Sequence, residues 1–248
     1  MFLINKILNK IKKIYLKELF QPSFFLGILI NPFFIIRRNL MSSIKSIAPD
    51  FNSGLLLDIG CGSKPYMVFF NVEKYIGIDL LESGHNHSTS KIDLFYDGKS
   101  IPFKEESFDY VFSSEVFQQV FELDVLLIEI NRVLKKGGKL AFTCPFVWDE
   151  HEKPYDYARY TSFGLNHILR KNGFRIILLK KTTPYFLTIV QMTSAYFYQH
   201  VLPSNRLFRM LLALFIVSPI NILGLIFNIF LPKNFDFYHN NIVIAQKD

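Results

Sequence analysis

A chain of 248 residues is long enough for one α/β domain with a buried core and some additional segments. Half of the residues are hydrophobic and 27 are phenylalanine, which is unusual for a freely soluble enzyme and indicates that part of the chain contacts lipid. Cys61 and Cys144 lie in predicted core segments without CxxC spacing, so the composition excludes a disulfide-stabilised secreted domain and favours a cytosolic location.

Residues 1–49 carry the whole net charge of +7. This leader has eight lysines and arginines against one acid, Glu18, whereas the remainder has 20 basic and 20 acidic residues. Because the basic patch is confined to an apolar amphipathic leader, we expect anionic lipid headgroups as its partner, and no nucleic acid. A genome-wide bias in amino-acid usage is the alternative explanation. No small-residue cleavage site follows, which argues against a secretory signal.

The leader contains two apolar segments. In residues 2–20 apolar side chains recur at helical spacing with lysines between them, which predicts an amphipathic helix. Residues 24–36 are apolar but only about 13 residues long and interrupted by Asn31 and Pro32, whereas a membrane span needs about 20 residues. We expect this second segment to lie in a membrane interface or to cap the core.

From Leu55 onward, short apolar strands alternate with amphipathic helices, which predicts βαβ units and a mainly parallel sheet. Glycines at 137, 138 and 173 mark the ends of the later helices. The predicted helices are residues 122–134 and 162–171, and the predicted strands are residues 55–59, 75–79, 92–95, 108–113, 139–143, 174–179 and 242–245.

A hydrophobic insertion separates the last two predicted strands. Its residues 210–231 are uncharged but contain Pro219 and Asn221. If the flanking strands pair in one cytosolic sheet, the insertion must return to the side it left, so it crosses a bilayer an even number of times, re-enters as a hairpin or lies flat in the interface. A buried helical pair packed on the sheet is the alternative. The predicted organisation is a leader over residues 1–49, a core over 50–182, the insertion over 183–238 and a closing strand within 239–248.

A glycine-rich turn follows the first predicted strand. Residues 55–66 read LLLDIGCGSKPY, so Asp58 is followed by Gly60 and Gly62. Glycines allow the backbone to approach a ligand closely. A dinucleotide site would have a third glycine where this chain has Pro65, so the pyrophosphate-binding pattern is incomplete.

Five motifs in order resemble the class I S-adenosylmethionine (SAM) dependent methyltransferases, over about residues 50–180. They are residues 58–62 (DIGCG), 77–79 (GID), 101–103 (IPF), 107–109 (SFD) and 132–138 (RVLKKGG). The resemblance implies a Rossmann-like sheet with helices on both faces and SAM as the cofactor. It assigns the donor site to Asp58, Gly60, Cys61, Gly62, Asp79, Leu80, Asp93, Leu94 and Ser113.

The resemblance also implies individual roles in this donor site. Gly60 and Gly62 would pass under the methionyl part, Asp58 would orient its amino group, and Asp79 would accept both ribose hydroxyls. For the two aspartates the alternative is a purely structural role. Asp93 is the predicted adenine-binding acid, with Asp97 as the alternative.

The predicted acceptor segment is residues 151–161 (HEKPYDYARYT), which follows the fifth strand. A similar HxxPxDxxRxT stretch occurs in methyltransferases encoded among genes for bacterial surface polysaccharides. His151 is the candidate general base, Tyr155 a further candidate catalytic residue and Arg159 a binder of an anionic acceptor group. The alternatives are a capping role for His151 and a buried Asp156–Arg159 pair that fixes the loop. The family often has Glu-His at positions 118–119, where this chain has Gln-Gln, so no role is transferred to this pair.

The sequence therefore predicts methyl transfer from SAM to an oxygen of a membrane-linked acceptor, a glycan precursor on a lipid carrier, at the cytoplasmic face. The rivals are methylation of a lipid or quinone and a non-catalytic SAM-binding membrane adaptor. Oxidoreduction with NAD is disfavoured by Pro65. No metal site is predicted, because Glu82, His85 and His87 lie in a Ser- and Gly-rich loop without supporting ligands.

Overall fold

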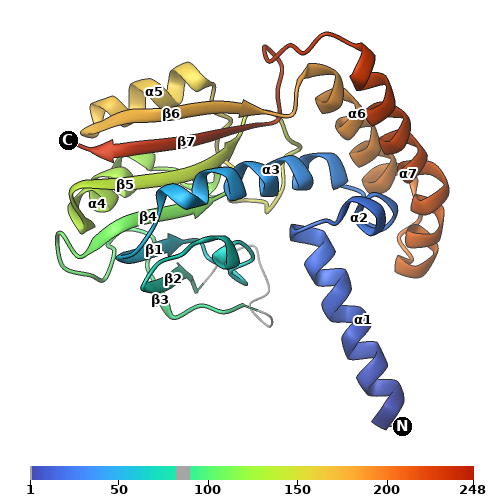
Figure 1. The fold of residues 1–248 in the computed structure, drawn as a ribbon, viewed down its shortest axis with the longest axis horizontal. Coiled ribbons are helices and arrows are strands. Elements are labelled where there is room, and N and C mark those ends of the chain that lie inside the picture. Colours follow the sequence, from blue (N-terminus) through green and yellow to red (C-terminus); the bar gives the residue numbers. More distant parts are fainter. Residues whose placement is uncertain (1, 82–89) are drawn as a thin grey trace. The chain divides into compact units, whose positions relative to one another are not determined.

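The computed structural model describes residues 2–81 and 90–248 (Figure 1). Contacts divide the chain into two compact units. The helical unit comprises Met1–Ser42 and Thr183–Tyr238, and the sheet unit comprises Ser43–Thr182 and His239–Asp248. The first boundary thus lies before Ser43, whereas the sequence predicts it after residue 49.

The sheet unit is built on a seven-stranded sheet of order β3-β2-β1-β4-β5-β7-β6. Strand β7 is antiparallel to β5 and β6, and the pairings among β1 to β5 are parallel. The predicted Rossmann-like α/β sheet with a closing strand is confirmed. The strands are β1 (Leu55–Ile59), β2 (Lys74–Leu80), β3 (Leu94–Tyr96), β4 (Phe108–Ser114), β5 (Leu134–Pro145), β6 (Phe174–Thr182) and β7 (Asn240–Lys247).

The register of the parallel strands aligns the carboxyl ends of β1, β2 and β4. Asp58 lies beside Gly77 of β2 and Phe112 of β4, and Ile59 lies beside Ser113. Ligands of open α/β sheets bind outside this edge. The predicted donor residues on β1, β2 and β4 therefore meet at one edge.

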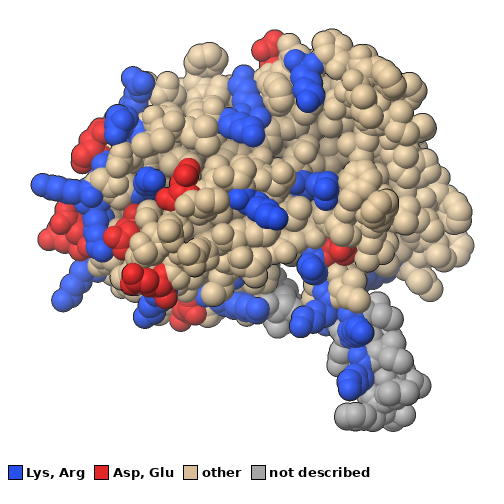
Figure 2. Space-filling model, viewed as in Figure 1, with Lys and Arg blue, Asp and Glu red and all other residues tan. Residues whose placement is uncertain are grey.

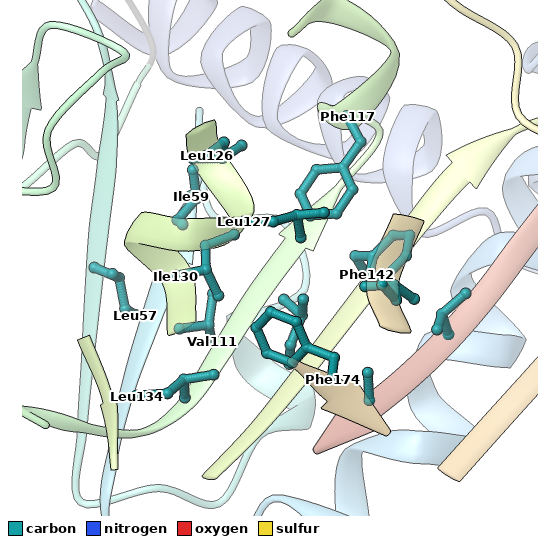
Figure 3. Packing of buried hydrophobic residues seen from close by; sticks show 14 of the residues in the cluster. Leu57, Ile59, Val111, Phe117, Leu126, Leu127, Ile130, Leu134, Phe142 and Phe174 are labelled. Carbon is teal, nitrogen blue, oxygen red and sulfur yellow. The ribbon is translucent and has the colours of Figure 1, made fainter. Parts of the chain in front are cut away.

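The main core lies between one face of the sheet and the helices α4 (Leu123–Val133) and α5 (Ser162–Lys171). Helix α4 buries the side chains that recur at helical spacing, and Figure 3 shows Leu127 and Ile130 among the sheet residues Leu57 and Val111. Helix α5 begins after Thr161, whose Oγ1 accepts a hydrogen bond from the Gly164 N–H at 3.0 Å.

The opposite face of the sheet packs against aromatic side chains. Leu56 and Phe112 alternate with the residues that face α4, so they point to the other side. The Phe112 ring lies 4.9 Å from the ring of Phe70 and 6.5 Å from that of Tyr66. Among its described residues, this unit contains the short 3-10 helices η1 (Ala48–Asp50), η2 (Met67–Phe69) and η4 (Phe117–Gln119).

The helical unit has two separate stretches of sequence. The first holds α1 (Phe2–Phe20), α2 (Phe24–Ile30) and the start of α3 (Phe34–Ile47), and the second holds α6 (Tyr185–Tyr196), the π-helical η5 (Phe197–Val201) and α7 (Arg206–Phe230). The predicted amphipathic helix over residues 2–20 is α1. The second apolar segment forms two helices, separated where Asn31 and Pro32 interrupt it.

Helix α7 is long and apolar enough to cross a membrane, with a mean hydropathy of 2.5, and it is the only such helix among residues 2–81 and 90–248. Only 28% of its most apolar window is buried. Most of α7 therefore does not serve as the core of this unit.

Candidate active site

A tight turn after β1 forms the first part of the site. Gly60 has a φ of +70° and Gly62 a φ of +47°, which are left-handed values that favour glycine. A Cβ on Gly60 would lie 2.3 Å from Val116 Cγ2, whereas a Cβ on Gly62 would meet no atom within 4 Å. Gly60 thus lets the turn pack on the loop after β4, and Gly62 faces open space.

Asp79 ends β2 directly beside this turn. Its Oδ2 accepts a hydrogen bond from the Gly62 N–H at 2.9 Å, and its Oδ1 accepts one from the Leu80 N–H at 2.9 Å. Each carboxylate oxygen keeps a further lone pair. The structure thus brings the predicted residues Gly62, Asp79 and Leu80 together and leaves the carboxylate able to accept from a pair of hydroxyls.

Asp58 lies beneath the turn and is 3% exposed. Burial raises the pKa of its carboxyl to about 7, although a hydrogen bond of 2.6 Å from the Tyr75 hydroxyl and the charge of Lys64 oppose the rise. Burial likewise raises the pKa of the Cys61 thiol to about 12. Asp58 is therefore poised between its neutral and charged forms near neutral pH, and Cys61 is an uncharged packing residue.

Asp93 is held by an ion pair with Lys64, whose side chain is 7% exposed. Its carboxylate also accepts a hydrogen bond from the Gly77 N–H at 2.7 Å. Partial burial by itself would raise the pKa of Asp93, but the hydrogen bonds from Gly77 and Lys64 lower it below its usual value. A Cβ on Gly77 would lie 2.4 Å from Lys64 Cε, so the absence of a side chain at residue 77 leaves room for the Lys64 side chain to reach Asp93.

The strand expected over residues 92–95 is β3, which begins at Leu94 and ends at Tyr96. Asp93 therefore precedes the strand, and Asp97, the alternative adenine-binding acid, follows it at the ligand-binding edge. The Asp97 carboxylate accepts from the backbone N–H groups of Lys99 and Ser100. Asp97 thus stands at the carboxyl end of β3 and Asp93 beside Gly77 within β2, and the assignment of Asp93 and Leu94 to adenine stays a prediction.

Ser113 links two strands of the sheet. Its hydroxyl is fully buried and donates to the carbonyl oxygen of Ile59 at 3.0 Å. This hydrogen bond fixes the end of β4 against the end of β1. Ser113 therefore supports from below the glycine turn of residues 60–62, which is called the donor turn from here on.

A polar cluster lies where β4, β5 and β7 meet. Glu115, with a φ of +61°, accepts through Oε1 from the Thr143 hydroxyl and from Asn240 Nδ2, both at 2.7 Å. Gln118 Nε2 donates to the Glu115 carbonyl oxygen at 2.6 Å. Gln118 and Asn240 are fully buried, and within the part of the chain that the structure describes neither Gln118 Oε1 nor Asn240 Oδ1 has a hydrogen-bond partner.

The predicted acceptor loop is organised by Asp156. Its carboxylate binds both terminal nitrogens of Arg159 and accepts from the His151 N–H at 2.9 Å. Partial burial by itself would raise the pKa of Asp156, but the hydrogen bonds from Arg159 and His151 lower it to about 2. His151 Nδ1 lies 3.4 Å from Asp156 Oδ2. Arg159 is therefore already paired, whereas Tyr155 is exposed.

The loop is attached to the polar cluster. The N–H groups of Tyr157 and Ala158 donate to the Gln118 carbonyl oxygen at 2.9 and 3.1 Å, and Asn241 Nδ2 donates to the Tyr160 carbonyl oxygen at 3.0 Å. The cluster also adjoins the donor turn, because Val116, the residue after Glu115, packs on Gly60. Donor turn, polar cluster and acceptor loop thus form one continuous site.

Across residues 2–81 and 90–248, no three His, Cys, Asp or Glu side chains are grouped so that they could hold a metal ion. The loop with Glu82, His85 and His87 lies outside the described residues.

Comparisons with known proteins agree with this geometry. Residues 57–142 match the family described as "Methyltransferase domain". The chain is 27% identical over 119 residues to malonyl-[acyl-carrier protein] O-methyltransferase of Methylococcus capsulatus, covering 44% of this chain and 42% of that protein. It is 30% identical over 104 residues to fatty-acid O-methyltransferase of Mycolicibacterium smegmatis, covering 38% of each. The chain thus spans about two fifths of the length of these curated relatives.

A solved structure shares the fold. Phosphoethanolamine N-methyltransferase 2 of Haemonchus contortus, in complex with S-adenosyl-L-methionine, superposes with a TM-score of 0.55 and 21% identity. The match covers 89% of this chain and 56% of that protein.

Proposed function

We propose that this chain, whose residues 57–142 match a methyltransferase domain, transfers a methyl group from SAM to an oxygen of a membrane-linked acceptor. The observation that carries the proposal is the continuity of the donor turn with a buried polar cluster that has unpaired hydrogen-bond acceptors.

The donor turn fits SAM. Gly62 leaves open space, and Asp79 beside it retains lone pairs for a ribose. Asp58 supplies a buried carboxyl that a cationic amino group would stabilise in its charged form. SAM supplies a methyl group on a sulfonium that is already an activated leaving group, so the protein's contribution is largely alignment.

The polar cluster fits an acceptor that donates a hydrogen bond. A buried carbonyl oxygen without a partner costs about 1–3 kcal/mol, and Gln118 Oε1 and Asn240 Oδ1 are two such atoms in one cluster. A substrate hydroxyl would satisfy one of them. His151 is the proposed base for its proton, and Glu115 offers a carboxylate in the same continuous site.

The acceptor we propose is a glycan precursor on a lipid carrier at the cytoplasmic face of a membrane. The extensive exposed apolar surface of the helical unit supports a membrane-linked substrate. A lipid is the second candidate, which is favoured by the similarity to a fatty-acid O-methyltransferase. A non-catalytic SAM-binding adaptor is the third.

The deciding experiment titrates the detergent-solubilised chain with SAM by calorimetry, for wild type, Asp79→Asn and Asp50→Asn. Asp50 is exposed and precedes β1, whereas the turn follows it, so its variant controls for the loss of one carboxylate. We expect micromolar binding that weakens at least about tenfold in Asp79→Asn, the effect of losing a charged hydrogen bond, and remains unchanged in Asp50→Asn. Absence of binding by folded wild type would refute the donor assignment.

The acceptor is then identified with radiolabelled SAM and two substrate pools, lipid-linked saccharides and a total lipid extract. Label in the first pool supports the proposed acceptor, and label only in the second supports the lipid alternative. SAM binding without label in either pool, unchanged by His151→Ala, would favour the adaptor.

A further inference from the structure

The outer surface of α7 is apolar along its whole length. Phe208, Phe215 and Phe230 are 61%, 73% and 79% exposed, and at 100° per residue they lie within about 60° of one another around the helix axis. Ala213, Val217 and Gly224 are buried on the opposite side. Leu26 and Phe25 of α2 are exposed as well. A helix of a soluble protein has the reverse arrangement, with its polar side facing outward.

The interior of the same unit contains buried polar side chains beside its two apolar clusters. Ser194 of α6 donates to Asn221 Oδ1 of α7 at 2.8 Å, and the Ser218 hydroxyl donates to the Leu29 carbonyl oxygen at 3.0 Å. Gln191 Nε2 donates to the Pro32 carbonyl oxygen at 3.0 Å. These side chains are buried. Small and polar residues between helices with apolar residues outside are typical of helices packed in lipid.

Close approach of α6 and α7 completes this pattern. A Cβ on Gly224 would lie 2.4 Å from Val190 Cγ1, so the glycine allows the two helix backbones to approach. Both ends of the segment from α6 to α7 join strands of one sheet, β6 and β7. A hairpin so connected cannot leave one end on each side of a bilayer.

The unit is also strongly basic. Its two stretches contain ten lysines and arginines against two acids, Glu18 and Asp236, and Glu18 is buried, with its carboxylate accepting from Ser23. Figure 2 shows the contrast between the mostly uncharged surface over α6 and α7 and the basic residues of α1. Lys10, Lys12 and Lys13 of α1 are exposed.

Arginines at the start of α7 lie over aromatic rings. The Arg206 guanidinium carbon is 5.5 Å from the Tyr15 ring centre, and that of Arg209 is 5.5 Å from the Tyr198 ring centre. Lys233 follows the other end of α7, and residues 210–232 between them are uncharged. Cations and aromatic rings at both ends of an apolar helix match the headgroup level of a bilayer.

We propose that the helical unit embeds in one leaflet of an anionic bilayer, with α7 lying in the membrane plane, its outer face in the acyl chains and its basic ends at the headgroups. This inference does not depend on the methyl-transfer reaction. An apolar groove of about 180 Å³ between α2 and α7, lined by Leu29, Leu211 and Leu214 among others, is filled by an acyl chain in this arrangement.

The first test is flotation of the full-length protein with vesicles of phosphatidylcholine, with or without phosphatidylglycerol. We expect binding to the anionic vesicles to fall about a hundredfold when Lys10, Lys12 and Lys13 are replaced by Gln, because each contributes about 1 kcal/mol. The double variant Phe215→Asn, Phe230→Asn should also lose binding. Its matched control is Phe163→Asn on α5 of the sheet unit, which is 82% exposed and should bind like wild type.

The second test measures how deeply α7 lies in the bilayer. The only tryptophan, Trp148, is replaced by Phe, and single tryptophans are placed at 208, 215 or 230 and quenched by lipids brominated along the acyl chain. A helix in the plane gives all three the same depth. A spanning helix, about 33 Å from 208 to 230, would place 215 deepest.

Three outcomes decide the matter. Anionic-lipid-dependent binding with equal depths supports the proposal. A depth maximum at 215 would overturn the in-plane geometry. No binding by wild type, or equal loss in Phe163→Asn, would overturn the membrane role itself, and circular dichroism of the same samples shows whether each variant is folded.

Discussion

At the scale of single residues, Asp58 links donor binding to pH. Its pKa of about 7 means that the charged carboxylate, the form that attracts a cationic amino group, increases from pH 6 to pH 8. We predict that SAM affinity rises about tenfold across this range, in proportion to the charged fraction, and that Asp58→Asn abolishes the pH dependence. Calorimetric titration at several pH values measures it. If SAM affinity depended on pH as strongly in Asp58→Asn as in wild type, another group would be responsible for the pH dependence.

The same shift has an opposite effect on stability. The folded-state pKa of Asp58 lies above the ordinary value of 3.8, so the folded protein binds the proton more tightly than the unfolded chain does. The stabilisation is complete below about pH 4 and is lost as the pH rises to about 7. SAM binding is therefore favoured by the charged form of this carboxyl, whereas folding is favoured by its protonated form.

Glu115 is the residue we expect to separate acceptor chemistry from donor binding. Glu115→Gln keeps the shape of the side chain and one oxygen that can still accept from Thr143 and Asn240, but it removes the negative charge and replaces the other oxygen with an NH₂ group that cannot accept a proton. We predict a fall in kcat of about 10²-fold, the lower end for loss of a base or of its orientation, with an unchanged Kd for SAM. A parallel loss of SAM binding would show a structural role instead.

At the scale of elements, α4 holds the sheet unit together through one face. Ile130 is fully buried and Ile128 of the same helix is 58% exposed. We predict that Ile130→Ala lowers the free energy of unfolding by about 2–5 kcal/mol, whereas Ile128→Ala changes it by less than about 0.5 kcal/mol. Denaturant unfolding monitored by circular dichroism makes the comparison. Equal effects would mean that α4 does not pack as described.

Elements of the sheet unit could be predicted because the strands and helices have their own apolar periods, and because Gly60 follows β1 and Gly173 follows the last turn of α5, whereas Gly137 and Gly138, expected to end a helix, lie within β5. The donor turn was predictable for the same reason, since Gly60, Gly62 and Asp79 are close in sequence. Glu115, Thr143 and Asn240 come from three strands that are far apart in the chain, and only the register of the sheet brings them together. The only sequence signal was a polar residue at the end of an apolar strand.

Asp93 shows a different limit of sequence reasoning. Asp93 lies beside Gly77 of β2, whereas Asp97 follows the last residue of β3, so the start of a three-residue strand decides which acid stands at its carboxyl end. For α7 the hydrophobic composition was evident, but the separation of polar inner and apolar outer sides appears only when its neighbours α2 and α6 are known.

At the scale of the whole molecule, charge is divided between the two units. The helical unit has a net charge of +8 and the sheet unit of −1, as counted over their residues. We predict that about 0.5 M NaCl, where the screening length falls below about 5 Å, weakens binding to anionic vesicles but does not abolish it, because burial of apolar side chains is insensitive to screening. Flotation across a salt series tests this. Complete release would mean that charge alone holds the protein.

The position of β7 in the chain bears on how the protein is made. This strand pairs with both β5 and β6 in the sheet, yet its residues follow the whole α6–α7 segment. During synthesis the apolar hairpin therefore leaves the ribosome before the strand that completes the sheet. A nascent chain has its hydrophobic segment available while the catalytic fold is still open, so delivery to a lipid surface can precede the first moment at which the domain is able to work.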